Sequence, residues 1–293
     1  MHPASSSPVR DRPFKQVDVF TTTPYRGNPL AVVLEGSGLD EEAMQRFARW
    51  THLSETTFLL PPKHPDADYR VRIFTPGGEL PFAGHPTLGS CHAWLEAGGS
   101  PKRGDGLVQE CKVGLVRIRR EQTRLAFAAP PLKLGTPDPV LLAKIISALG
   151  LHPGQLIAAQ LLDNGPIWLG LLLDSVQTVV GLRPDHGALK VLGQKVGVAA
   201  RYPAADGDGS DSPAMEVRAF AAPIGIEEDP VTGSLNASLA HWLIALGHMP
   251  PTYLAAQGSC LDRAGRVYIA QDAAKGIWVG GESVTCITGK VRL

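Results

Sequence analysis

The sequence predicts a mixed α/β (α+β) protein with two pseudo-symmetric lobes, and three observations lead to this fold class. The chain has 293 residues, which is enough for two domains of ordinary size that each bury a core. Short runs rich in β-branched and aromatic residues alternate with helix-like segments in both halves. A similar series of residue types also occurs twice, once in each half, as an internal duplication would produce.

The first half is predicted to contain several strands and one clear helix. Residues 40–51 begin with Asp40 in a position to cap a helix, followed by two Glu residues in the first turn and by apolar residues at helical spacing. Apolar runs bounded by Gly, Pro and Asn predict strands at residues 14–20, 30–34, 55–60 and 69–74.

The second half follows a Pro-containing stretch, with a helix predicted at residues 140–149 and strands at residues 156–162 and 167–173. Residues 201–213 are rich in Gly, Asp and Ser, which predicts a solvated loop whose acidic residues are weak candidates for metal ligands. We expect a disordered tail at residues 1–13, an N-terminal lobe at residues 14–124 joined by the C-terminal tail 285–293, and a C-terminal lobe at residues 125–284.

The composition argues against several classes of function. Lys plus Arg and Asp plus Glu number 28 each, and without a basic run we expect no nucleic-acid partner. No apolar stretch approaches the roughly 20 residues that cross a bilayer, and the start of the chain lacks a signal-peptide pattern, so we expect no membrane contact and a cytoplasmic protein. The four cysteines are scattered without zinc-site spacing, which predicts free thiols and no metal.

The internal repeat has the form V-R-x-F, turn, X-P-x-x-G-S, helix. Residues 71–74 lead to residues 85–90 in the first copy, and residues 217–220 lead to residues 229–234 in the second. Because Pro is favoured at the first position of a helix, the residue before it is expected at an N-cap-like position. The match therefore predicts that His85 and Asp229 are equivalent residues at the starts of two helices.

Two helix starts of this kind can bind an anion. The N–H groups of residues 87–89 and 231–233 would point at it, Gly89 and Gly233 would let it approach, and a Ser follows each Gly. If a pseudo-two-fold axis relates the lobes, the two helix starts face each other across an interlobe cleft, which binds a carboxylate without a metal or a basic side chain. One ionisable side chain on each side then fits proton transfer next to that carboxylate.

The patterns alone leave other interpretations open. Asp before Pro is often only a helix cap, and Glu55 is either a surface residue at a strand edge or a partly desolvated acid with a raised pKa. A metal hydrolase using His85 and His92 is a weaker alternative, because seven positions place the two rings two helical turns apart. A non-catalytic, partner-binding protein is another. No phosphate-cradling motif predicts a nucleotide cofactor.

The chain resembles the phenazine-biosynthesis isomerase-like (PhzF-like) family, which has the diaminopimelate epimerase fold. The matching segments occur in register over most of the chain. They are D-V-F at residues 18–20, G-N-P-L-A-V at 27–32, L-S-E-T-T-F at 53–58, F-T-P at 74–76, E-L-P-F-A-G-H-P-T-L-G at 79–89 and E-D-P-V-T-G-S at 228–234.

This resemblance implies two lobes, each a curled sheet around a central helix, and usually a homodimer. It implies a cofactor-independent isomerase that transfers a proton on a small carboxylate in the interlobe cleft. The implied residues are Glu55 as acid/base, His85 and Asp229 as catalytic partners, and Gly84, Gly233 and Ser234 as substrate-binding residues. Epimerase and racemase relatives carry two cysteines in the loops, and this chain does not. An inactive member and an epimerase with other acid/base groups stay as alternatives.

Overall fold

The computed structural model describes residues 9–104, 106–203 and 212–293. The chain divides into two compact units: unit 1 is residues 1–25, 29–127 and 282–293, and unit 2 is residues 26–28 and 128–281. The loop predicted at residues 201–213 lies outside the described residues between 204 and 211. Among the described residues, no helix is both long and apolar enough to cross a membrane.

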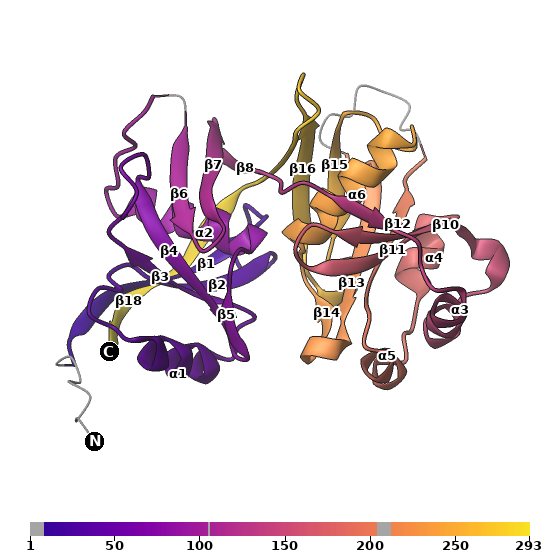
Figure 1. Ribbon diagram of the computed structural model, residues 1–293, viewed down its shortest axis with the longest axis horizontal. Helices are drawn as coiled ribbons and strands as arrows, with labels where there is room; N and C mark the ends of the chain where they lie inside the picture. Colours follow the sequence, from indigo (N-terminus) through magenta and orange to yellow (C-terminus); the bar gives the residue numbers. More distant parts are fainter. Residues whose placement is uncertain (1–8, 105, 204–211) are drawn as a thin grey trace. The chain divides into compact units, whose positions relative to one another are not determined.

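Unit 1 is a mixed sheet with one helix packed among its strands and one at its edge (Figure 1). Its elements are β1 (Asp11–Val19), β2 (Asn28–Val33), α1 (Glu41–Thr51), β3 (Thr56–Leu60), β4 (Tyr69–Thr75), β5 (Gly78–Leu80), α2 (Gly84–Glu96), β6 (Leu107–Cys111), β7 (Gly114–Glu121), β8 (Arg124–Ala128) and β18 (Ser283–Arg292).

The two helices of unit 1 differ in how far they are buried between its strands. β2 and β3 are parallel and are joined through α1, whereas β3, β4 and β5 run antiparallel and β4 also pairs parallel with β6. α1 is amphipathic: Asp40 accepts from Ala43 N–H as its cap, and only Met44, Phe47 and Ala48 are buried. α2 is buried over most of its length against β1, β3 and β18, which makes it the central helix of the unit.

Unit 2 contains the remaining elements of the chain (Figure 1). They are β9 (Lys133–Gly135), α3 (Pro139–Ala148), β10 (Leu156–Asp163), β11 (Ile167–Leu173), α4 (Val176–Gly181), α5 (His186–Leu192), β12 (Lys195–Arg201), β13 (Met215–Ala221), β14 (Ile226–Asp229), α6 (Gly233–Ala245), β15 (Thr252–Gln257), β16 (Gly265–Gln271) and β17 (Ile277–Gly281), with single 3₁₀ turns at Pro153–Gln155, Ala222–Ile224 and Ser259–Leu261.

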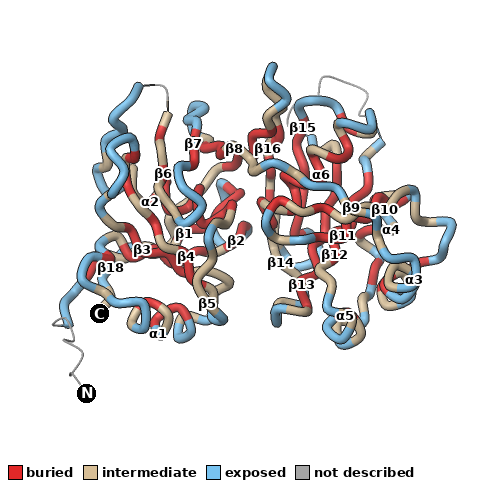
Figure 2. Tube along the Cα trace, in the orientation of Figure 1, coloured by how far each residue is buried: buried red, intermediate tan, exposed pale blue. Residues whose placement is uncertain are grey.

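Unit 2 repeats the connections of unit 1. β11 and β12 are parallel and joined through helices, β12, β13 and β14 run antiparallel, and β13 pairs parallel with β15. α6 is buried against β10, β16 and β17, as α2 is in unit 1. Figure 2 shows buried residues along the strands of each unit and exposed residues along α1, α3 and α5. The predicted mixed α/β fold, with a similar arrangement in each half, is confirmed.

Most predicted elements occur within a few residues of their expected limits. β1 begins at Asp11, three residues before the predicted strand, because Arg12 is buried and its guanidinium donates to the carbonyl groups of Glu35 and Ser37. β3 begins at Thr56. Glu55 therefore lies just before the strand in which the sequence placed it.

Candidate active site

Glu55 and His85 meet in unit 1. Glu55 precedes β3, and His85 is the second residue of α2, the helix that packs against that strand. Glu55 Oε2 lies 3.3 Å from His85 Nε2, and only 14% of the Glu55 side chain and 6% of the His85 side chain are exposed. Burial raises the pKa of Glu55 to about 7, although a hydrogen bond with Ser54 acts in the opposite direction. The open question about Glu55 is thus decided in favour of a desolvated acid.

The start of α2 differs from the predicted N-cap geometry. Ala83 is the N-cap, so His85 and Pro86 lie inside the first turn. Thr87 N–H, which we expected to face an anion, instead donates to the Ala83 carbonyl at 3.2 Å. The helix begins earlier than expected because the buried Gly84 and His85 already have helical geometry, and Pro is compatible with any position of a first turn.

Gly89 and Ser90 serve packing within unit 1 and not the approach of an anion. A Cβ at Gly89 would lie 2.7 Å from Leu30 Cδ2 and 2.8 Å from Val19 Cγ2, so the absent side chain leaves room for β1 and β2. Ser90 is fully buried and donates to Thr57 Oγ1 at 2.9 Å. The role predicted for this pair is wrong.

Asp229 lies in unit 2 at the end of β14, in a hydrogen-bonded turn. Asn28 Nδ2 donates to its Oδ1 at 3.0 Å, and the Thr232 hydroxyl donates to its Oδ2. Gln257 joins the turn from β15: its Nε2 donates to the Asp229 carbonyl at 3.0 Å, and its Oε1 accepts from Thr232 N–H at 3.0 Å. The Asp229 carboxylate is therefore held in one orientation from several sides.

α6 begins three residues later than the repeat predicted. Thr232 is its N-cap, and Gly233 and Ser234 are its first two residues, so Asp229 is a turn residue and not a helix cap. The Trp168 Nε1–H donates to Ser234 Oγ at 3.2 Å. Because each is the second residue of its helix, Ser234 of α6 corresponds in position to His85 of α2.

Two ion pairs show the correct register of the internal repeat. On β4, Arg72 donates from Nε and Nη2 to the two carboxylate oxygens of Glu79 on β5. The Arg72 Cζ atom also lies 5.0 Å from the centroid of the Phe74 ring. On β13, Arg218 binds Glu228 of β14 in the same way, with distances of 2.9 and 2.8 Å, and lies over Phe220 at 5.0 Å.

These pairs align E-L-P-F-A-G-H at residues 79–85 with E-D-P-V-T-G-S at residues 228–234. In this register Gly84 corresponds to Gly233, and Asp229 corresponds to Leu80. The predicted equivalence of His85 and Asp229 is wrong, because the X-P-x-x-G-S match was displaced by five residues in the first copy.

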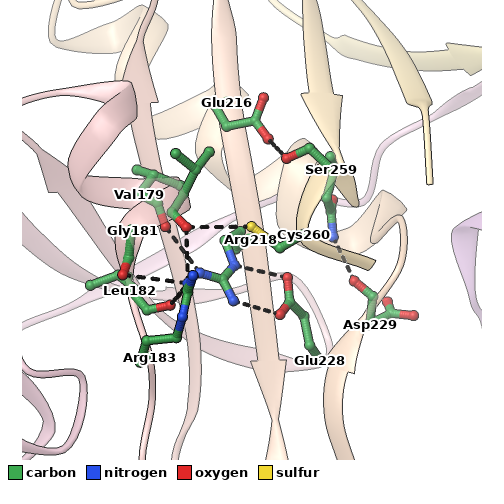
Figure 3. A network of polar contacts seen from close by, with 12 residues as sticks. Val179, Gly181, Leu182, Arg183, Glu216, Arg218, Glu228, Asp229, Ser259 and Cys260 are labelled. Atoms are coloured by element: carbon green, nitrogen blue, oxygen red, sulfur yellow. Dashed lines mark hydrogen bonds and ion pairs between the residues drawn. The ribbon is translucent and has the colours of Figure 1, made fainter. Parts of the chain in front are cut away.

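The Arg218 pair fixes the strand that ends in Asp229. Figure 3 shows the Arg218 guanidinium between Glu228 and the carbonyl groups at the end of α4. Its Nη1 donates to Val179 at 3.1 Å and to Leu182 at 3.0 Å, and the two charged side chains are 5% and 7% exposed. Because buried donors need acceptors, this network ties β14 to α4 and sets the position of the residue after Glu228.

The remaining predicted site residues have separate surroundings. His85 belongs to unit 1 and Asp229 to unit 2, so their approach across a cleft stays a prediction. His92 Nε2 lies 3.2 Å from Glu96 and 3.1 Å from Thr285, and it does not converge with His85 on one point. Among the described residues, no three His, Cys, Asp or Glu side chains gather in a way that could hold a metal ion.

Sequence reasoning did not single out Asn28, Gln257 or Lys195 as site residues, and it placed Trp168 only at the end of a segment, residues 161–168, expected to line the pocket. Asn28 lies in the G-N-P-L-A-V segment, which was a signal for it, whereas Gln257 and Lys195 occur in strands without a recognisable motif. All four become visible only through tertiary contacts with residues 229–234.

Comparison with known proteins shows the family of the chain. The family model of phenazine biosynthesis-like proteins, PhzC-PhzF, matches residues 17–289. The chain is 36% identical to antisense-enhancing sequence 1 of Schizosaccharomyces pombe, covering 96% of this chain and 99% of that protein. It is 33% identical to trans-2,3-dihydro-3-hydroxyanthranilate isomerase of Pseudomonas aeruginosa, covering 92% of each.

A solved structure has the same fold. The PhzF-family phenazine biosynthesis protein of Bacillus anthracis superposes with a TM-score of 0.82 at 22% identity, covering 97% of this chain and all of that one. The predicted fold class is therefore confirmed over nearly the whole chain.

Proposed function

Since the chain belongs to the phenazine biosynthesis-like (PhzC-PhzF) family and is an isomerase, we propose that it moves a proton within one small carboxylate substrate, with Glu55 as the acid/base and no cofactor. The single observation that carries this proposal is the buried Glu55 carboxyl beside His85, with a pKa of about 7. In the proposed reaction a proton leaves one carbon and one returns at another carbon of the same molecule, and a single group acts first as base and then as acid. A pKa near neutrality allows both.

The other site residues receive binding roles in this proposal. His85 orients the Glu55 carboxyl and relays its proton. The fixed Asp229 carboxylate accepts a hydrogen bond from an amino or hydroxyl group of the substrate, and Ser234 adds a hydroxyl. The backbone of Gly84 and Gly233 contacts the substrate carboxylate, and the residues of both units act on one substrate molecule, as the family resemblance implies.

The relative's name supplies a substrate to test, namely trans-2,3-dihydro-3-hydroxyanthranilate. The experiment follows isomerisation of this compound in D₂O by NMR, together with deuterium entry into the product. Wild type should introduce deuterium at carbon. Glu55→Gln should lower the rate by about 10² to 10⁴ while substrate binding persists, because the amide keeps the shape but cannot transfer the proton.

Glu121→Gln is the matched control, because it makes the same chemical change at an exposed position on β7. It should react like wild type. Unchanged exchange in Glu55→Gln would show that another group carries the proton. Absence of turnover in wild type would exclude trans-2,3-dihydro-3-hydroxyanthranilate as the substrate. Other small carboxylates would then be assayed in the same way.

The proposal has two further parts. We propose a homodimer, which rests on the family resemblance, and a cytoplasmic location, which rests on the sequence patterns given above. Light scattering at micromolar concentration tests the first, and a monomeric mass would contradict it.

A further inference from the structure

Lys195 lies close to the start of α6. It is the first residue of β12, and its Nζ lies 4.9 Å from the centroid of the Trp168 ring. Trp168 is the residue paired with Lys195 in the parallel β11–β12 ladder, and its indole N–H donates to Ser234 Oγ. The Trp168 ring therefore contacts both the Lys195 ammonium and Ser234, the second residue of α6.

The strand registers make Lys195 the counterpart of Glu55. In unit 1, Thr56 pairs with Phe74 of the V-R-x-F segment, and Glu55 directly precedes Thr56. In unit 2, Val196 pairs with Phe220 of the second V-R-x-F segment, and Lys195 directly precedes Val196. The duplicated frame thus presents a carboxyl in one unit and an ammonium in the other, each near the second residue of its central helix.

Around Lys195 and Ser234 some charged and polar groups have no partner among the described residues. Across the part of the chain that the structure describes, no carboxylate oxygen forms an ion pair with Lys195 Nζ within 4.0 Å. Asn164 is 7% exposed; its Nδ2 donates to the Ser234 carbonyl at 2.9 Å, whereas its Oδ1 is buried and has no hydrogen-bond partner among the described residues. The N–H groups in the first turn of a helix also lack partners within the helix.

Electrostatics agree with an anion at this place. Burial lowers the pKa of Lys195, and the charge of Asp229 acts in the opposite direction. A cation held on an aromatic face keeps its charge at a small cost, and the positive end of the helix dipole lies at Gly233 and Ser234. A buried ammonium and a helix start together favour a negative group; the Asp229 carboxylate supplies part of that charge, and its oxygens already accept hydrogen bonds from Asn28 and Thr232.

We propose that Lys195 binds the anionic group of the substrate at the start of α6, so that the site selects carboxylates that also carry a hydrogen-bond donor for Asp229. The substrate class is a small amino or hydroxy acid. This inference rests on the proposed function for the identity of the site, but it is tested by binding alone. It replaces the expectation that the carboxylate is bound without a basic side chain.

The test uses benzoate as the anion and benzamide as its uncharged analogue. NMR titrations of the full chain follow the Gly233 and Ser234 amides in wild type, Lys195→Met, Lys195→Arg and Lys190→Met. Met keeps the length that packs on Trp168 and removes the charge. Lys190 is an exposed residue of α5 and supplies a matched loss of charge elsewhere in the same unit.

Benzoate should shift both amides in wild type, Lys195→Arg and Lys190→Met, and should bind Lys195→Met about tenfold or more weakly, since a charge-assisted hydrogen bond is lost. Benzamide should bind wild type and Lys195→Met alike. Three results overturn the proposal: no benzoate-dependent shift in wild type, equal benzoate affinity in Lys195→Met, or an equal loss for benzamide, which would show a packing role.

The proton-exchange assay distinguishes this failure from failure of the proposed function. If Lys195→Met binds benzoate weakly but Glu55→Gln still exchanges normally, the anion site stands and the catalytic assignment falls. If Lys195→Met lowers kcat with benzoate affinity and KM unchanged, Lys195 acts on the proton and not on the anion.

Discussion

Replacing Glu55 by Gln should change how the stability of the protein depends on pH. Burial raises the folded-state pKa of this carboxyl from 4.5 to about 7. Each unit of pKa corresponds to about 1.4 kcal/mol between protonation states, so the difference amounts to about 3 kcal/mol. A side chain that is 14% exposed is shielded from water well enough for most of this energy to appear in unfolding.

The sign follows from which state binds the proton more tightly. Below pH 4.5 the carboxyl is protonated in both states and has no effect. Between pH 4.5 and 7 the unfolded chain loses the proton while the folded protein retains it, so the folded state is progressively destabilised. Above pH 7 the full cost of about 3 kcal/mol is present. Glu55→Gln does not titrate, and it should therefore gain stability relative to wild type across this window.

Urea unfolding at pH 4, 5.5, 7 and 8 measures the effect. The free energy of unfolding of Glu55→Gln minus that of wild type should rise by about 3 kcal/mol between pH 4 and pH 8. Glu121→Gln, at an exposed position, should show a nearly constant difference. A flat difference for Glu55→Gln would refute the raised pKa and with it the argument that Glu55 is poised to exchange protons at neutral pH.

Two further predictions concern the frame around the site. Glu228→Gln should lower the free energy of unfolding by about 3 kcal/mol because it leaves the buried Arg218 charge uncompensated, whereas Glu79→Gln should cost only about 1 to 2 kcal/mol because Arg72 is 22% exposed and also binds Glu41. Equal losses in urea unfolding would contradict the difference in burial. Gly89→Ala should destabilise by about 1 to 2 kcal/mol, because the added methyl meets buried Leu30 and Val19 and this outweighs the better helix propensity of Ala; a variant as stable as wild type would show that β1 and β2 shift freely.

Local patterns were sufficient for the elements whose residues carry their own signals. The Asp40 cap and the apolar spacing after it predicted α1 to within one residue, because the cap and the spacing are both set by residues of this one segment. The state of Glu55 could not be decided in this way. Its pKa depends on burial by a helix that starts almost thirty residues later, and a strand-edge pattern is compatible with either outcome.

The register of the repeat was missed for a different physical reason. The turn between Arg and Glu is longer in the second copy, which contains a 3₁₀ turn at Ala222–Ile224, so the V-R-x-F segments and the helix starts cannot be aligned together without a gap. The sequence contained the better signal, E-x-P-x-x-G, in both copies. Only the ion pairs Arg72–Glu79 and Arg218–Glu228 show that this motif marks equivalent positions.

The corrected register changes what the duplication contributes to chemistry. The frame is the same in both units: an Arg–Glu pair on a hairpin, a Gly at the start of a buried helix, and a strand paired to the Phe beside the Arg. The residues differ at both matched positions: the second residue of the helix is His85 in α2 and Ser234 in α6, and the residue before the neighbouring strand pairing is Glu55 in unit 1 and Lys195 in unit 2. The duplicated frame therefore carries a buried carboxyl at this position in unit 1 and an ammonium on an aromatic face in unit 2, so the shared fold does not give the two units the same chemistry at matched positions.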